Sequence, residues 1–272
     1  MAPIALVLAI IVVALGGIYL VQVLREPPPA GDLADRAVPN TIDLTIPFAG
    51  TPAQDWADGA AGIVVPEPRA VDGHEAERVG AAYEQVRRIL VTARLDRTVI
   101  EGGDGQALAA LFAQDVRESV AAEFAPGSGT SVLGTRIAPG FRLAAAEPKV
   151  SGRMWAESGP DGSLLVRTNY VFAYAFHTDD PDSLVSTLDT VAMIRADVDF
   201  AVLEGKSWEP VSRGVRPEAS ETGFYAMACG PAEAGMLAPA WSEPGYGTAP
   251  DPREPRDYFD PAAPMDFPDG CA

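Results

Sequence analysis

The first 24 residues constrain this chain more than any other part of it. From Ile4 to Val21 no charged or amide side chain interrupts the apolar run, and Arg25 is the first charged residue. About 21 helical residues span roughly 31 Å, which matches the hydrocarbon core of a bilayer. We therefore predict a single transmembrane helix that acts as a signal anchor. A cleaved signal peptide is the alternative, but the segment before the run lacks Lys and Arg and the run is too long.

Two arguments disagree about which side of the membrane the remaining chain occupies. Arg25 and Arg36 follow the apolar run, and the positive-inside rule then favours a cytoplasmic domain. The two cysteines favour the opposite side. A disulfide between Cys229 and the penultimate Cys271 would close a loop of about 43 residues, contribute roughly 4 kcal/mol and require an oxidising compartment. We give the cysteines more weight and expect a domain outside the cytoplasm; two free thiols are the alternative.

The charge of the chain restricts its partners. The formal net charge is −18, and a chain this acidic repels phosphate backbones and anionic lipid headgroups. We therefore expect no nucleic-acid partner and a domain that stands off the membrane surface.

Prolines and glycines concentrate in two regions that flank a more regular centre, and this distribution divides the chain. The expected parts are a transmembrane anchor at 1–24, a Pro-rich linker at 25–46, an α+β domain at 47–228 whose residues 47–73 dock on it, and a Pro-rich acidic C-terminal strap at 229–272.

Two helices are predicted in the first half of the domain. Apolar residues at helical spacing predict one helix over 75–95, with Arg94 mostly off the apolar stripe. The stripe consists of Val79, Tyr83, Val86, Leu90 and Ala93. After the turn at Gly102-Gly103, Asp104 is a good N-cap for a second helix over 106–124.

The pattern then changes to the two-residue alternation of β-strands. Long strands are predicted over 164–176 and 188–202, joined by a turn-rich segment and therefore paired as an antiparallel hairpin. Further candidate strands are 142–146, 150–156, 208–213 and 223–227. Helices followed by an antiparallel meander predict an α+β fold, with both helices packed on a curved sheet in a cystatin-like or NTF2-like layout.

Few residues are suited to catalysis or metal binding. His177 lies beside Asp179 and Asp180, which is the proximity that a carboxylate-oriented general base needs. A solvated turn with a polar histidine explains the same residues. Two histidines and two cysteines form a poor set of metal ligands, so we expect neither a metal nor a cofactor.

Aromatic residues alternate along the first long strand. Tyr170, Phe172 and Tyr174 share one face, and they are candidates for the wall of a ligand pocket. Alternating aromatic residues also form the ordinary core under helices, and the two interpretations stay open here.

Three segments carry a resemblance to a known group of proteins. They are PFAGTPA at 47–53, WADGAAGIVVPE at 56–67 and ILVTARLD at 89–96. Together they resemble a family of uncharacterised single-pass membrane-anchored proteins of high-GC actinobacteria, over roughly residues 1–240. Eighteen arginines against two lysines fit a GC-rich genome. The family has no assigned activity, so the resemblance implies a location and an architecture but no catalytic residues.

These observations favour a non-catalytic binding or structural module of the cell envelope, with a protein or a small ligand as its partner. One alternative is an NTF2-like hydrolase or isomerase that uses His177 as acid and base. Another is an adaptor that faces the cytoplasm and keeps its cysteines reduced.

Overall fold

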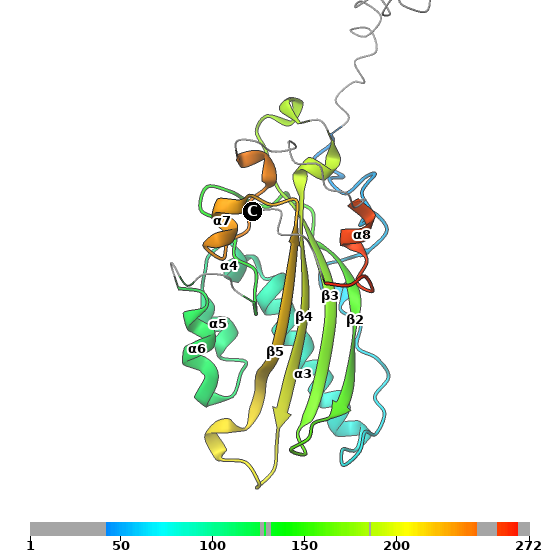
Figure 1. The fold of residues 1–272 in the computed structure, drawn as a ribbon, viewed down its shortest axis with the longest axis vertical. Coiled ribbons are helices and arrows are strands. Elements are labelled where there is room, and N and C mark those ends of the chain that lie inside the picture. Colours follow the sequence, from blue (N-terminus) through cyan, green and yellow to red (C-terminus); the bar gives the residue numbers. More distant parts are fainter. Residues whose placement is uncertain (1–41, 126–127, 129–131, 185, 244–254, 266–272) are drawn as a thin grey trace, which may run out of the picture. The chain divides into compact units, whose positions relative to one another are not determined.

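The computed structural model describes residues 42–265, apart from 126–127, 129–131, 185 and 244–254. Its centre is an antiparallel sheet of five strands in the order β1-β2-β3-β4-β5 (Figure 1). The strands are β1 Ala57–Asp58, β2 Lys149–Ser158, β3 Leu164–Ala175, β4 Val191–Leu203 and β5 Gly214–Tyr225. The helices are α3 Ala76–Arg94, α4 Arg97–Ile100, α5 Gly105–Ala109, α6 Arg117–Ala122, α7 Cys229–Glu233 and α8 Pro255–Phe259. The expected α+β class is confirmed.

The predicted hairpin forms the middle of the sheet. Tyr170 pairs with Ala196 and Phe172 pairs with Ile194 across β3 and β4, so the alternating apolar residues of both strands share one face. This inner face is buried under the helices. The second strand starts later than expected, because residues 187–190 form a 3-10 turn that Ser186 and Asp189 cap reciprocally.

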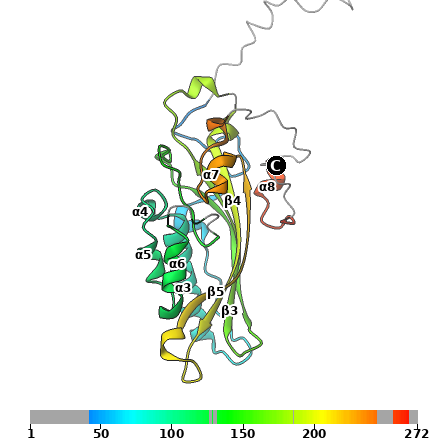
Figure 2. The ribbon, with the colours of Figure 1, turned by 60° about the vertical axis from the view of Figure 1, so that its left-hand side comes forward.

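Helix α3 lies along the inner face, as the apolar stripe predicts. All five predicted stripe residues are buried, from Val79 to Ala93. Figure 2 shows α3, α5 and α6 on one side of the sheet and α8 on the other. Arg94 is also buried, contrary to its expected place off the stripe, because its guanidinium donates to the carbonyl of Val132 (2.6 Å) and to the hydroxyl of Thr135 (3.3 Å).

The second predicted helix is broken into two short helices. Asp104 caps α5 as expected by accepting from the backbone NH of Gln106 at 3.0 Å. The chain then turns, and the NH of Ala113 donates to the carbonyl of Val215 on β5 instead of continuing the helix. Gly105 lies so close to Phe124 that a β-carbon would not fit, which allows α5 and α6 to pack together. Both helices still face one core, so the helical spacing alone did not reveal the turn.

The sequence prediction was wrong about the last strand and two earlier segments. Residues 208–213 contain a 3-10 turn, and β5 runs from Gly214 to Tyr225, where only its end was predicted. Residues 142–146 contribute a single bridge, between Leu143 and Phe176. Most of β5 was not predicted, because the strand is mostly polar and contains Pro217. Both features are tolerated at the edge of a sheet, where β5 lies.

Two segments cover one end of the outer face, which is the face of the sheet opposite to α3. Phe48 from the expected docking segment and Tyr258 and Phe259 from α8 are buried there. Tyr258 stacks on Tyr225 at 4.1 Å between ring centroids. The underlying sheet residues are Val171, Ala173, Ala175, Val191 and Met193. The docking segment also inserts Ile63 into the core, whereas Val64 is 66% exposed.

Within the described residues, no helix is long and apolar enough to cross a membrane. The predicted anchor at 1–24 and most of the linker lie outside those residues, so both stay predictions.

Gly152 provides a test of the β2–β3 pairing. Its φ is +152°, and a β-carbon would overlap the carbonyl oxygen of Asn169 and the ring of Tyr170. We expect Gly152→Ala to lower the free energy of unfolding by about 3 kcal/mol, through backbone strain and steric overlap together. Urea denaturation of the purified chain measures the change.

Gly205 supplies the control for this substitution. It also has a positive φ, +90°, but a β-carbon there meets no atom within 4 Å. Gly205→Ala should therefore cost only about 1 kcal/mol. Equal losses for the two variants would contradict the proposed overlap at Gly152.

Candidate functional site

The outer face contains an open cleft of about 380 Å³ beyond the covered end. Its lining comes from the three middle strands and β5. The chemically distinctive lining residues are Trp155, Arg167, Asn169, Asp197, Asp199 and Glu221. A volume of this size falls within the range of about 300–1,000 Å³ that is usual for small-molecule sites. The cleft is therefore the candidate ligand site.

Strand alternation places these side chains together. Arg167 pairs with Asp199 and Asn169 pairs with Asp197 across β3 and β4, while Trp155 on β2 pairs with Arg167. The two-residue alternation of the predicted strands places these β3 and β4 residues on the face opposite the aromatic residues. It did not reveal that they meet Trp155 and Glu221, because that meeting depends on strand order and register. A search for polar residues at alternate positions of the predicted hairpin would have found the central four.

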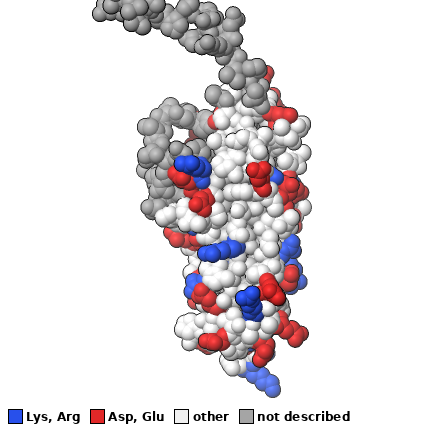
Figure 3. All heavy atoms as spheres, turned by 90° about the vertical axis from the view of Figure 1, so that its right-hand side faces the viewer, with Lys and Arg blue, Asp and Glu red and all other residues white. Residues whose placement is uncertain are grey.

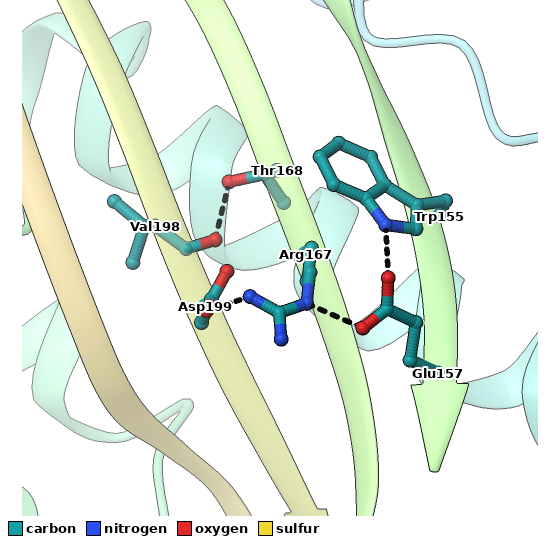
Figure 4. A network of polar contacts seen from close by, with 6 residues as sticks. All are labelled: Trp155, Glu157, Arg167, Thr168, Val198 and Asp199. Atoms are coloured by element: carbon teal, nitrogen blue, oxygen red, sulfur yellow. Dashed lines mark hydrogen bonds and ion pairs between the residues drawn. The ribbon is translucent and has the colours of Figure 1, made fainter. Parts of the chain in front are cut away.

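Arg167 is the centre of a hydrogen-bond network (Figure 4). Its Nε donates to Oε2 of Glu157 and its Nη1 donates to Oδ2 of Asp199, each at 2.7 Å. The indole NH of Trp155 donates to Oε1 of Glu157 at 2.9 Å. On the opposite face of the sheet, the hydroxyl of Thr168 links β3 to β4 by donating to the carbonyl of Val198 at 2.8 Å. The network fixes the guanidinium and the indole relative to each other.

The two carboxylates that bind Arg167 have different electrostatic environments. Hydrogen bonds from Trp155 and Arg167 lower the pKa of Glu157. Partial burial raises the pKa of Asp199, and Arg167 only partly opposes this effect. The negative charges of Glu157 and Asp197 also raise the pKa of Asp199. The lining of the cleft therefore carries more negative charge than its arginine balances, with Asp197, Asp199 and Glu221 against Arg167.

A second polar group lies where the cleft meets the covered end. Asn169 donates through Nδ2 to Oδ2 of Asp197 at 3.0 Å, and Nη2 of Arg195 donates to the same oxygen at 3.2 Å. The Arg195 side chain is only 5% exposed, and its Nη1 donates to the carbonyl of Ala263 in the segment after α8. The C-terminal strap is thus connected to the cleft through Arg195, which bonds both Ala263 and the lining residue Asp197.

The predicted acid–base residues lie elsewhere, beyond the C-terminal end of β3. Nε2 of His177 is 2.9 Å from Oδ1 of Asp179, so the predicted proximity is present. Arg142 contacts the same oxygen at 3.2 Å, and His177 and Arg142 together lower the pKa of Asp179. The Asp179 side chain is 92% exposed, and Asp180 is also exposed. The structure brings the pair together at the surface, while its catalytic role stays a prediction.

The predicted pocket residues lie in the core. Tyr170, Phe172 and Tyr174 have no exposed surface, and Phe172 and Tyr174 stack with ring centroids 6.5 Å apart. The hydroxyl of Tyr174 donates to the carbonyl of Arg94 at 3.0 Å and lies 2.7 Å from the hydroxyl of Thr135. These contacts are those of an ordinary core, which was one of the two interpretations of the sequence. The other interpretation, a ligand role for these residues, stays a prediction.

The structure describes only one of the two cysteines that we predict to pair. Cys229 begins α7, where its backbone NH and that of Gly230 donate to the carboxylate of Glu243. Cys271 lies outside the described residues, so the disulfide stays a prediction. Among the residues that the structure describes, no group of three or more His, Cys, Asp or Glu side chains is arranged to hold a metal ion.

Comparisons with known proteins add no family or relative. No protein-family model, no curated protein and no solved structure matches the chain. The interpretation of the cleft therefore rests on its own geometry.

The buried hydroxyl of Tyr174 predicts a loss of stability at alkaline pH. Burial raises the pKa of Tyr174 to about 12, above its ordinary value of 10.0. The neutral hydroxyl therefore stabilises the fold below pH 10, and this contribution falls as the pH rises towards 12, by up to about 1.4 kcal/mol per pH unit. Tyr174→Phe should cost about 1–2 kcal/mol at pH 7 because two hydrogen bonds are lost. That cost should shrink steadily above pH 10, measured by urea denaturation.

Tyr170 provides a matched comparison. Burial also raises its pKa to about 12, but its hydroxyl has no hydrogen-bond partner among the described residues. Tyr170→Phe should leave the free energy of unfolding at pH 7 nearly unchanged and should also reduce the alkaline loss. A pH-independent cost for Tyr174→Phe would show that its hydroxyl ionises as easily in the folded state as in the unfolded state.

Proposed function

We propose that this chain is a non-catalytic binding module of the cell envelope, and that its ligand occupies the cleft on the outer face. The observation that carries this proposal is the fixed polar network around Arg167, which lines a hollow of ligand size. Side chains held by one another lose little freedom when a ligand binds, which favours recognition. Glu157 and Asp199 already hold the guanidinium of Arg167 through hydrogen bonds, so we assign these side chains a role in binding.

We further propose that the N-terminal apolar run anchors the module in a membrane as a single-pass helix. The length of the run supports this, and so does the resemblance to anchored actinobacterial proteins. The packing of α3 on an antiparallel meander supports the finer assignment of a cystatin-like or NTF2-like layout. In this arrangement the ligand site lies on the outer face of the sheet and not in the mouth of a cone.

The module is proposed to face away from the cytoplasm. The cysteine pair supports this side, because a disulfide would give the penultimate Cys271 a structural role and disulfides persist in oxidising compartments. The described surface suits water on either side of the membrane: Figure 3 shows acidic and basic side chains interspersed on the side of the molecule where β2 lies. We do not expect nucleic-acid binding, because the chain carries a net charge of −18.

Thiol labelling tests the side of the membrane. With a membrane-impermeant maleimide on intact cells, we expect Cys229 and Cys271 to react only after prior reduction, because they are paired outside the cytoplasm. Peptide mass spectrometry measures the labelled fraction at each cysteine. Labelling without reductant, and only after lysis, would instead place free thiols in the cytoplasm and favour an adaptor.

A cysteine in the cleft tests whether a ligand is bound in the cell. Ala219 lines the cleft and is exposed, so Ala219→Cys introduces a reactive thiol with little change in volume. We expect this cysteine to react at least about threefold more slowly on intact cells than in the purified chain, because the ligand covers it.

The control for this experiment lies on the helical side of the sheet. Ala110 is exposed directly after α5, outside the cleft, and Ala110→Cys should react at similar rates in both settings. Equal rates for Ala219→Cys in cells and in the purified chain would count against an occupied cleft.

A further inference from the structure

The cleft presents hydrogen-bond donors and acceptors in alternation. Arg167 uses Nε and Nη1 on carboxylates, which leaves the hydrogens of Nη2 for a ligand. Asn169 uses Nδ2 on Asp197, and its carbonyl oxygen can accept. Asp199 receives Arg167 through Oδ2, and its second oxygen can also accept. A ligand group that both donates and accepts matches this set better than one that does only one of the two.

The positions of the charges argue most strongly against anionic ligands. The lining carries three carboxylates, Asp197, Asp199 and Glu221, against the one guanidinium of Arg167. Glu157 and Asp199 flank that guanidinium, and Glu221 lies across from Asp197, so an anionic group meets carboxylates on both sides. A neutral ligand with several hydroxyl groups avoids this repulsion, and beside Arg167 it also avoids the repulsion that a cationic group would meet. It can donate to the carboxylates and accept from the guanidinium at the same time.

Trp155 supplies an apolar surface next to these polar groups. The indole is half-buried and its NH is already bound to Glu157, so the ring is held in one orientation. The guanidinium carbon of Arg153 lies 5.0 Å from the ring centroid, while Arg153 itself is exposed. The ring face therefore attracts flat groups with positive polarisation, and a ligand can take this place because Arg153 is exposed. The C–H groups on one face of a sugar ring fit this description.

We propose that the cleft binds a neutral saccharide, with one sugar ring on Trp155 and its hydroxyl groups on Arg167, Asn169 and Asp199. The volume of about 380 Å³ limits the bound part to a few sugar units. This inference rests on the proposed function, since it names the ligand class of the same site. Trp155 contributes the apolar contact, and the network around Arg167 orients the hydroxyl groups.

The test is calorimetric titration of the purified full-length chain in a detergent without sugar headgroups. The neutral probes are glucose, galactose, mannose, arabinose, N-acetylglucosamine and their disaccharides. Glucosamine and glucuronate are the charged counterparts of glucose, and galactosamine and galacturonate are those of galactose. We expect saturable binding of at least one neutral sugar and weaker binding of its charged counterparts. Trp155→Ala should weaken that binding at least about tenfold, because the stacking surface is lost.

Two further variants distinguish the loss of a sugar contact from a general loss of folding. Asn169→Ala removes one of the side chains proposed to bind the hydroxyl groups of the sugar. It should weaken binding about three- to tenfold, while circular dichroism confirms the fold. Trp208, also half-buried, lies after β4 and outside the cleft lining, so Trp208→Ala should leave sugar binding unchanged.

Three outcomes overturn the proposal. Binding that is insensitive to both Trp155→Ala and Asn169→Ala would place the sugar elsewhere. Tighter binding of a charged counterpart would replace the neutral ligand with an amine or an acid. Failure of every sugar overturns the saccharide class, and the cleft cysteine then separates the two proposals. Protection of Ala219→Cys in cells would leave the binding function standing with another ligand, and its absence would remove both.

Discussion

The pairing of β3 with β4 is the constraint on which the other features of the fold depend. The register sets Tyr170 against Ala196 on one face and Arg167 against Asp199 on the other. A shift of one residue would move the aromatic side chains into solvent and the charged ones under α3. The hydrophobic stabilisation of the inner face therefore also fixes the geometry of the polar network, although the two share no side chains.

The inner face is not wholly apolar, and its polar groups show how the helices are held. The buried guanidinium of Arg94 and the hydroxyl of Tyr174 meet at the C-terminal end of α3, where Thr135 and the carbonyl of Val132 complete the contacts. Removing the hydroxyl of Thr135 would take one hydrogen-bond partner from each of these two buried groups. This cluster ties α3, β3 and the segment before β2 together at one place in the core.

The sequence predicted those elements in which local pattern and long-range packing agree. Val79 to Ala93 form a continuous stripe on one helix, and the alternation from Leu164 onwards survives over twelve residues, so both elements were recognised. The break at Ala113 was missed, because its cause is a backbone hydrogen bond to Val215, about a hundred residues away in sequence. Strand β5 was mostly missed because pairing with β4, and not its own composition, makes it a strand. The cleft required the register of four strands at once, which no local pattern contains.

The outer face is divided at Arg195, and this division explains which part of the sheet is left open. On one side of that residue, Val171 and Met193 are apolar, and Phe48, Tyr258 and Phe259 cover them because burial of apolar surface is favourable. On the other side, Asp197 and Asp199 already have hydrogen-bond partners on neighbouring strands, so covering them would gain little and would remove charged groups from water. Arg195 bonds to Ala263 on the covered side and to Asp197 on the open side. The same physical rule that brings the strap onto the sheet therefore also stops it there, and leaves the polar cleft available to a ligand.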